Sequence, residues 1–223
     1  YVQLQPIKDL TLKTTFSPSY TGIRTGQFED TNTSARGENL NHAYSYNVHK
    51  FQWTWDNQID YNKTWNDHTL GIMGLFSASK FNQDNYDADV YGVISQAMWY
   101  NMGQASDKNN YSIGSAYTEW SMLSWAARLA YNYKGRYYFT GTIRWDGSPR
   151  FAEGHRWGSF PSAAVAWRIS EEPFMEKAKS WLSNLKIRAS YGQTGNNAVG
   201  NYATQVVASG GSIYYGFSDK TGM

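Results

Sequence analysis

The chain has 223 residues, of which 41% are hydrophobic, so it is long enough to form one large domain or two small ones. Its formal net charge is +2, with no basic run that would indicate nucleic-acid binding. No stretch approaches the roughly 18–20 apolar residues that a membrane-spanning helix needs, and the absence of cysteine excludes disulfides and thiolate chemistry.

Aromatic residues make up 17% of the chain, with 10 Trp, 18 Tyr and 10 Phe. Tyr and Trp favour boundaries between apolar and wet surroundings, because each combines a large ring with a polar tip. This content is typical of a β-barrel that faces lipid outside and water inside. A carbohydrate-binding β-sandwich and a soluble aromatic-rich barrel are the alternatives.

Apolar and polar residues alternate along several segments, which predicts strands with one apolar face. In chain order the alternating runs cover residues 10–17, 51–61, 70–78, 125–133, 137–145, 162–168 and 185–191, and an eighth strand begins near Tyr202. Only Asn57 interrupts the apolar face of the second run. The fourth and fifth runs form a hairpin around Lys134-Gly135-Arg136.

The links between these runs alternate between long and short. Thr21–Asn41, Asn82–Ala116, Asp146–Gly158 and Gly192–Tyr202 are predicted as long loops, with a short helix within Val90–Met102, and residues 62–68 and 134–136 as short links. Ser170-Glu171-Glu172-Pro173 resembles a helix start with a capping Ser, and Phe174, Lys177 and Trp181 follow at helical spacing. This alternation predicts up-and-down topology with long loops at one end.

Charged residues within the runs all lie on the polar faces. They include Lys13, Asp56, Arg128, Arg144, Arg168, Lys186 and Arg188. A lipid-facing Lys or Arg near the bilayer midplane would cost roughly 2–4 kcal/mol, so this sorting is required of a membrane wall. A solvated sheet packed on a core would show the same sorting, so the charges fix the register and leave the membrane open.

No nucleotide-binding loop, hydrolase elbow or zinc-protease motif is present, and the four His residues are dispersed. Asp84, Asp87 and Asp89 have a spacing that can hold Ca²⁺ in a loop, but a solvated loop explains them better. Glu171 and Glu172 are better explained by a helix start than as a glycosidase pair. The sequence therefore predicts no enzyme, no metal and no cofactor.

Five motifs in this order resemble the barrel signature of the SusC/RagA family of TonB-dependent outer-membrane transporters. They are RLAYNYKGRY (128–137), RWDGSPRF (144–151), GSFPS (158–162), WRISEEPF (167–174) and LKIRASYGQTGN (185–196). The similarity is densest over residues 125–202 and weaker upstream, where YNKT and HTL of the hairpin at 61–74 also resemble the family. Pro149 stands where the family often has Ser.

This resemblance implies that residues 1–223 form part of one transmembrane β-barrel domain, about eight strands of a barrel of roughly 22. The plug and the TonB-contacting region would lie outside this chain, which fits an internal piece. The family implies a Bacteroidota-like outer membrane, contact with lipid, a SusD-like surface lipoprotein as partner, and TonB-driven import of glycans or oligopeptides. An open sheet would leave unpaired edges in lipid, so the rest of the wall is expected elsewhere.

Four residues at or above a strand top are candidates for substrate binding: Arg144, Asp146, Arg150 and Trp157. For Asp146-Gly147 a turn is the simpler interpretation. Two alternative functions remain open at this point: a SusC-like barrel that acts as a structural subunit of a larger outer-membrane assembly, and a secreted sugar-binding module.

Overall fold

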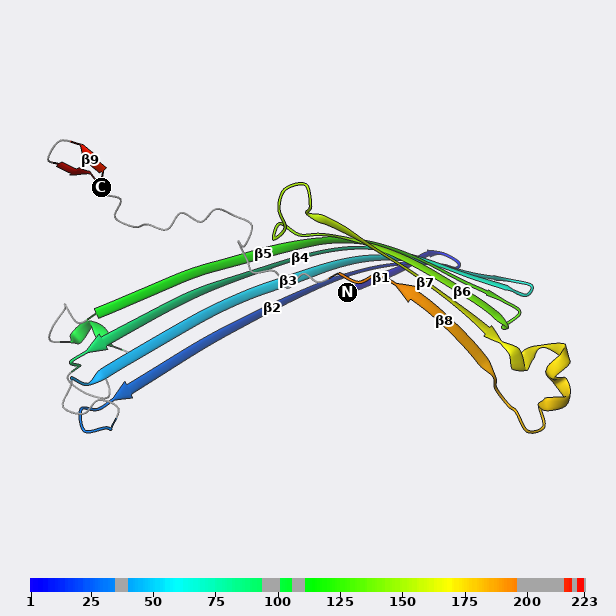
Figure 1. Cartoon of the computed structure of the whole chain (residues 1–223), viewed down its shortest axis with the longest axis horizontal. Coiled ribbons are helices and arrows are strands. Elements are labelled where there is room, and N and C mark those ends of the chain that lie inside the picture. The colour runs from blue at the N-terminus through cyan, green and yellow to red at the C-terminus, as the bar shows by residue number, and fades with distance from the viewer. Residues whose placement is uncertain (35–39, 94–100, 106–110, 196–214, 218–219, 223) are drawn as a thin grey trace.

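A computed structural model describes residues 1–34, 40–93, 101–105, 111–195, 215–217 and 220–222. It shows one eight-stranded antiparallel sheet in which each strand pairs with the next along the chain (Figure 1). The strands are β1 (Val2–Ile7), β2 (Leu10–Glu29), β3 (His42–Trp65), β4 (His68–Tyr91), β5 (Tyr111–Tyr133), β6 (Tyr137–Gly147), β7 (Trp157–Arg168) and β8 (Lys186–Gly192). The predicted all-β, up-and-down fold is confirmed.

The seven predicted runs fall on β2 to β8, apart from Leu185, which lies one residue before β8. The eighth strand of the sheet is β1 rather than the predicted strand near Tyr202, which lies outside the described residues. β1 is short and contains Pro6, so its alternation is hard to detect. β9 (Tyr215–Phe217) and β10 (Lys220–Gly222) form a separate two-stranded sheet.

The pairing register places all apolar runs on one side of the sheet, called here the apolar face. Leu12 pairs with Ile59, and Leu129 pairs with Gly141. Large side chains on this face are exposed, such as Trp125 at 51% and Val165 at 53%. Among the described residues only six hydrophobic side chains are buried: Ala43, Val48, Ala78, Val90, Val93 and Ala105. The sheet is thus a single layer whose apolar face is exposed along the predicted runs. Its only buried hydrophobic cluster within the described residues is small, and it lies at the ends of β3 and β4 far from those runs: Ala43, Val90, Val93 and Ala105.

Two rows of aromatic side chains cross the apolar face. The upper row is Phe16, Trp55, Phe76, Trp125 and Trp145, and the lower row is Trp65, His68, Tyr133, Tyr137 and Trp167. The ring centroids of Phe76 and Trp125 are 4.5 Å apart, and those of His68 and Tyr133 are 4.8 Å apart. On β4, β5 and β6 the two rows are eight residues apart. Between them, the apolar face of β4 to β8 carries no charged side chain.

Strands β2 to β5 are much longer than the sequence predicts, with 20, 24, 24 and 23 residues. The predicted loop at Thr21–Asn41 is wrong in its first part, because β2 continues to Glu29. The predicted insertion at Asn82–Ala116 is wrong at both ends, because β4 continues to Tyr91 and β5 begins at Tyr111. These strands extend well beyond the ends of β6 and β7 (Figure 1).

The third predicted loop is also shorter than expected, because Asp146 and Gly158 both lie on strands. The link between β6 and β7 therefore covers only residues 148–156. Most of the predicted helix at Val90–Met102 lies outside the described residues, and a 3-10 turn, η2 (Met102–Gln104), follows it. No helix of the described part is long and apolar enough to cross a membrane.

The opposite end of the sheet, called here the turn end, carries the tight connections. Asp9, Asn66 and Lys134 have positive φ angles of 71°, 47° and 54°. Backbone hydrogen bonds link one connection to the next. Lys134 N donates to Asp67 O at 2.7 Å, and Arg168 N donates to Arg136 O at 2.7 Å. These bonds join neighbouring hairpins at the turn end.

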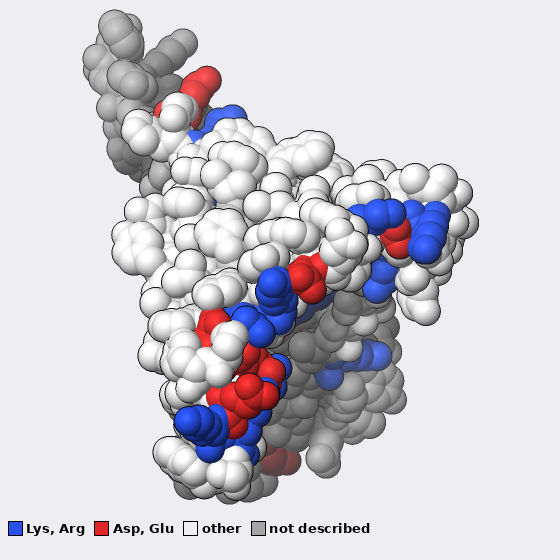
Figure 2. All heavy atoms as spheres, turned by 90° about the vertical axis from the view of Figure 1, so that its right-hand side faces the viewer, with Lys and Arg blue, Asp and Glu red and all other residues white. Residues whose placement is uncertain are grey.

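Ion pairs reinforce the same end of the sheet. Lys63 Nζ lies 3.0 Å from Asp9 Oδ2, and Lys134 Nζ lies 3.6 Å from Asp67 Oδ2. Figure 2 looks onto this end and shows basic and acidic side chains side by side along it, next to an uncharged face. Exposed pairs of this kind add little stability individually, so their main effect is to balance charge along the rim.

The link from β7 to β8 consists of two 3-10 segments, η4 (Ile169–Glu171) and η5 (Pro173–Ala178), instead of the predicted α-helix. Ser170 is not the cap, because Glu172 precedes η5 and neither segment has a side-chain capping bond. The Glu172 carboxylate is 6% exposed and accepts a 2.9 Å hydrogen bond from Trp167 Nε1. Arg136 Nη1 lies 3.4 Å from its other oxygen.

A charge on the apolar face tests the assignment of the two faces. Leu129→Arg places a guanidinium midway between the aromatic rows. It should lower the free energy of unfolding in vesicles, and so destabilise the fold, by roughly 2–4 kcal/mol. Ala130→Arg, one residue along on the other face, should cost much less. Urea titration of the full-length protein in vesicles measures both, and equal losses would refute the assignment.

Acidification tests the Glu172 contacts. Hydrogen bonds from Tyr137 and Trp167, with Arg136 nearby, hold the pKa of the Glu172 carboxyl below its ordinary value of 4.5. Because a depressed pKa stabilises the fold above the ordinary value, the link should loosen as pH falls below 4.5. Hydrogen exchange of residues 169–185, corrected for intrinsic rates, should rise at low pH, and Glu172→Gln should raise it already at neutral pH.

Candidate functional site

Two of the predicted binding residues meet at the top of β6. Arg144 and Asp146 are two residues apart and therefore lie on the same face, which is the polar face of the sheet. Arg144 Nε donates to both Asp146 carboxylate oxygens, at 2.8 and 2.9 Å. Arg144 Nη2 donates to Ser124 Oγ on β5 at 3.0 Å, and Ser124 is 1% exposed. The guanidinium is thus held in one orientation on the polar face.

A row of polar side chains continues from this pair across the wall. Ser124 is the register partner of Ser77 on β4, and Ser77 is the partner of Asp56 on β3. Ser77 Oγ donates to Asp56 Oδ1 at 2.5 Å. The polar face therefore offers a line of fixed hydroxyl, carboxylate and guanidinium groups at one height, which suits contact with hydrophilic material.

The other two predicted residues do not join this hydrogen-bond network. The Arg150 guanidinium lies 4.9 Å from the centroid of the Trp120 ring, a distance typical of a cation–π contact. Trp157 is the register partner of Gly147, and a Cβ at Gly147 would lie 2.8 Å from the Trp157 ring. Trp157 lies on the apolar-face side of β7, and it is 55% exposed. The structure thus joins Arg144 and Asp146 by hydrogen bonds, whereas Trp157 meets Asp146 only in the lining of one cavity and Arg150 packs on Trp120.

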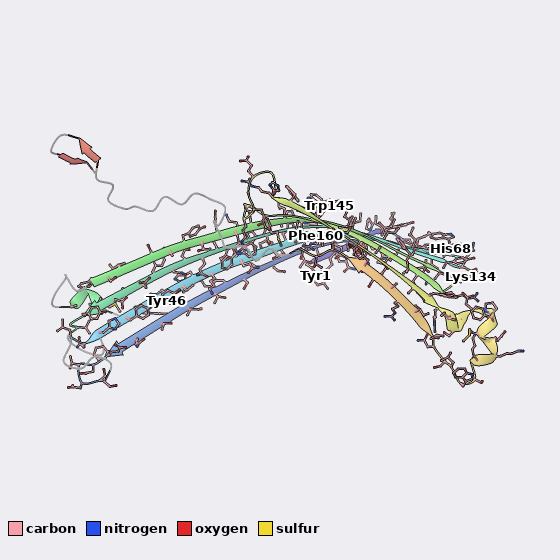
Figure 3. The ribbon with its side chains drawn as sticks, in the orientation of Figure 1. Tyr1, Tyr46, His68, Lys134, Trp145 and Phe160 are labelled. Carbon is pink, nitrogen blue, oxygen red and sulfur yellow. The ribbon has the colours of Figure 1, made fainter. Side chains whose placement is uncertain are left out.

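A small cavity of about 180 Å³ lies below the β6–β7 link. It is lined by Met122, Asp146, Ser148, Phe151, His155, Trp157, Gly158, Phe160 and Gly195. Phe160 is at the centre of this region (Figure 3), and its ring lies so close to Gly195 that a Cβ there would clash. Asp146 and Trp157 both contribute to the lining, which is otherwise largely apolar. The cavity can accommodate a small group next to one carboxylate.

Aromatic side chains also lie on the polar face of the long strands, where the sequence did not predict a site. The rings of Tyr44 and Tyr46 are nearly parallel, with centroids 6.4 Å apart, and Phe81 stacks on Trp120 at 5.7 Å. Tyr46 lies in the part of the sheet far from the turn end (Figure 3). All four lie between a predicted loop and the neighbouring predicted run. Rings on such a surface can stack on sugar rings or on peptide side chains.

The predicted acidic cluster does not form, because its residues lie on a strand and not in a loop. Asp84 is on the apolar-face side of β4, whereas Asp87 and Asp89 are on the polar face. Asp89 Oδ1 is 2.6 Å from His42 Nε2. The part of the chain that the structure describes holds no group of three acidic or His side chains suited to a metal ion.

The fold and these faces define a class: an open wall segment with an apolar outer face, two aromatic rows and a hydrophilic inner face, as in transmembrane β-barrels. β1 and β8 each pair on one side only within the described residues. No family model matches the chain.

Curated relatives agree with this class. The chain is 31% identical over 230 residues to TonB-dependent receptor P39 of Formosa agariphila, a match that covers 96% of this chain and 20% of that protein. It is 33% identical to TonB-dependent receptor SusC of Bacteroides thetaiotaomicron, with 79% and 18% covered. The chain thus spans about a fifth of the length of these relatives. They are receptors and not enzymes, in agreement with the predicted lack of catalysis.

Solved structures complete the comparison. The RagAB peptide importer in its closed-closed state superposes with a TM-score of 0.86 at 25% identity, covering 99% of this chain and 24% of the matched chain. Together with the relatives, this match confirms the predicted resemblance and identifies the chain as a β-barrel segment of the SusC/RagA type.

A pair of substitutions tests the Arg144 network. Arg144→Met leaves the Asp146 carboxylate and the buried Ser124 hydroxyl without this donor, which should cost roughly 1–3 kcal/mol. Adding Asp146→Leu removes the uncompensated carboxylate and should recover part of that loss. Urea unfolding of the full-length single and double variants measures the coupling, and strictly additive losses would show that the pair does not interact.

Proposed function

We propose that this chain forms part of the barrel wall of a TonB-dependent importer in a Gram-negative outer membrane. The observation that carries the proposal is the apolar face with its two aromatic rows. Eight residues correspond to about 27 Å along a strand, and a tilt of about 40° reduces this to roughly 20 Å across the membrane. That height approximates the apolar band of about 25 Å that outer-membrane barrels present to lipid.

The ends of the sheet give the wall its orientation. Outer-membrane barrels have short turns on the periplasmic side and longer connections outside. The tight connections at Asp9, Asn66 and Lys134 are then periplasmic, and the long strand extensions stand outside the cell. A crossing needs only about 9–11 residues, so roughly half of each of β2 to β5 lies beyond the lipid. The polar face lines the lumen and the outer vestibule.

The proposal extends to partners through the relatives. The relative from Bacteroides thetaiotaomicron is named a TonB-dependent receptor, and the solved RagAB structure is named a peptide importer. Energy from TonB and a nutrient substrate are therefore expected for the complete protein. A SusD-like surface lipoprotein is the expected partner at the outer end. The substrate is a glycan or an oligopeptide. Arg144, Asp146 and Arg150, with Tyr44 and Tyr46 on the polar face, are the wall residues proposed to meet it. Trp157 lies on the apolar-face side of β7 and is not among them.

Uptake measurements test the transport role. Deleting the gene together with its lipoprotein neighbour should abolish uptake of at least one member of a panel of labelled glycans and peptides. In the complemented strain, Arg150→Ala and Tyr46→Ala should raise the half-saturating concentration without lowering surface abundance. Tyr86→Ala serves as the control. Tyr86 is exposed on the apolar-face side of β4, away from the lumen, so this variant should leave uptake unchanged.

The same deletion separates transport from a structural role. Unchanged uptake of the whole panel, with a disturbed protein composition of the outer membrane, would favour a barrel that acts as a scaffold. Recovery of the native protein in the soluble fraction would refute the membrane wall itself and favour a sugar-binding module.

A further inference from the structure

The link between β7 and β8 exposes two aromatic side chains at the turn end. Phe174 is 68% exposed and Trp181 is 77% exposed, more than the 51% of Trp125 on the apolar face. The link covers residues 169–185, and its segment η5 contains no buried residue. Rings of this size are costly in water and favour the boundary between lipid and water.

Contacts of Glu172 place the start of this link on the apolar side of the wall. Its carboxylate accepts hydrogen bonds from Trp167 Nε1, at 2.9 Å, and from Tyr137. Both rings belong to the lower aromatic row. Arg136 holds the other carboxylate oxygen at 3.4 Å, so three side chains fix the link below that row. The link therefore continues the membrane-facing surface instead of turning into the lumen.

The remainder of the link is shaped for an interface. Backbone bonds from Trp181 N and Leu182 N to Ala178 O, at 3.1 and 2.8 Å, hold Trp181 in a tight turn after η5. Lys177 and Lys179 lie between the two exposed rings in sequence. Lys179 Nζ is 3.9 Å from Glu171 Oε2, whereas Lys177 makes no ion pair within the described part of the chain. Two rings and a lysine next to them match lipid headgroups above an apolar layer.

We propose that residues 173–182 form an interfacial anchor that lies in the headgroup layer of the periplasmic leaflet, with Phe174 and Trp181 inserted at the lipid boundary. This proposal rests on the proposed membrane wall. Lipid, and not a protein partner, is the occupant because the link is continuous with the lower aromatic row. The Lys177 ammonium group then meets lipid phosphates, and the link holds the wall at a fixed depth.

Depth-dependent fluorescence quenching tests the anchor in the full-length protein. The chain has no cysteine, so a bimane label can be introduced by Ser180→Cys, next to an intact Trp181. Vesicles of phosphatidylethanolamine and phosphatidylglycerol carry nitroxides at the headgroup or deep in the acyl chains. Labels at Leu129→Cys, between the aromatic rows, and at Ser34→Cys, beyond the strand β2, provide the deep and the aqueous references.

The Ser180→Cys label should be quenched more by headgroup nitroxides than by deep nitroxides. Adding Phe174→Ser and Trp181→Ser should reduce this quenching to the level of the aqueous reference, whereas Trp157→Ser should not change it. If the label at position 180 is quenched no more than the aqueous reference while the label at position 129 is quenched by deep nitroxides, the anchor is refuted and the membrane wall is not. Protection from aqueous iodide without lipid quenching would indicate a protein partner and also overturn it. Absence of quenching at position 129 would instead refute the membrane wall.

Discussion

Backbone hydrogen bonding in a medium without water is the constraint on which this sheet depends. Lipid offers no partner for an exposed amide or carbonyl, so a wall strand must be paired along its whole membrane length. Between β2 and β3 the register meets this demand without a shift from Leu10 to Glu29, and β4 pairs without a shift with both of its neighbours. Once the backbone is paired, the alternation of side chains decides which solvent each face can meet, and no packed core is needed.

The apolar face shows how far that constraint reaches into side chains. Asn57, the single polar residue on the apolar face of its run, accepts a hydrogen bond from Thr14 Oγ1 at 3.0 Å, and Trp55 Nε1 donates to the same hydroxyl at 2.9 Å. Three polar groups from two neighbouring strands thus satisfy one another beside the upper aromatic row. An amide facing lipid is tolerable when its oxygen is bonded in this way. What looks like a fault in the alternation is a closed local network.

The alternation was sufficient to predict the strands inside the membrane and the sorting of Arg128, Arg144 and Arg188 to one face. It failed above the upper aromatic row, where both faces of β2 to β5 meet water and the contrast between them disappears. His42-Ala43-Tyr44-Ser45-Tyr46 still alternates, but with a polar and aromatic inner side, so a search for aliphatic stripes does not find it. Extended strands in water and long loops have the same composition.

The candidate site was predictable only in part for a related reason. Arg144 and Asp146 were found because their spacing on one strand fixes their common face. The approach of Arg150 to Trp120 joins a loop to a strand more than twenty residues away, and nothing in a local pattern reports it. The contact of Glu172 with Tyr137 and Trp167 likewise depends on how the β7–β8 link folds back, which a helix-start motif does not reveal.

The bonds between neighbouring connections at the turn end have a further consequence for how the wall chooses one pairing among several. A slip of one residue would turn an apolar face toward water, but a slip of two residues restores every face and is invisible to alternation. Only features with a fixed height distinguish the native pairing from such a slip. The bonds from Lys134 to Asp67 and from Arg168 to Arg136 are features of this kind, because a two-residue displacement would break each of them. The turn end therefore fixes the register of the neighbouring strands of the wall.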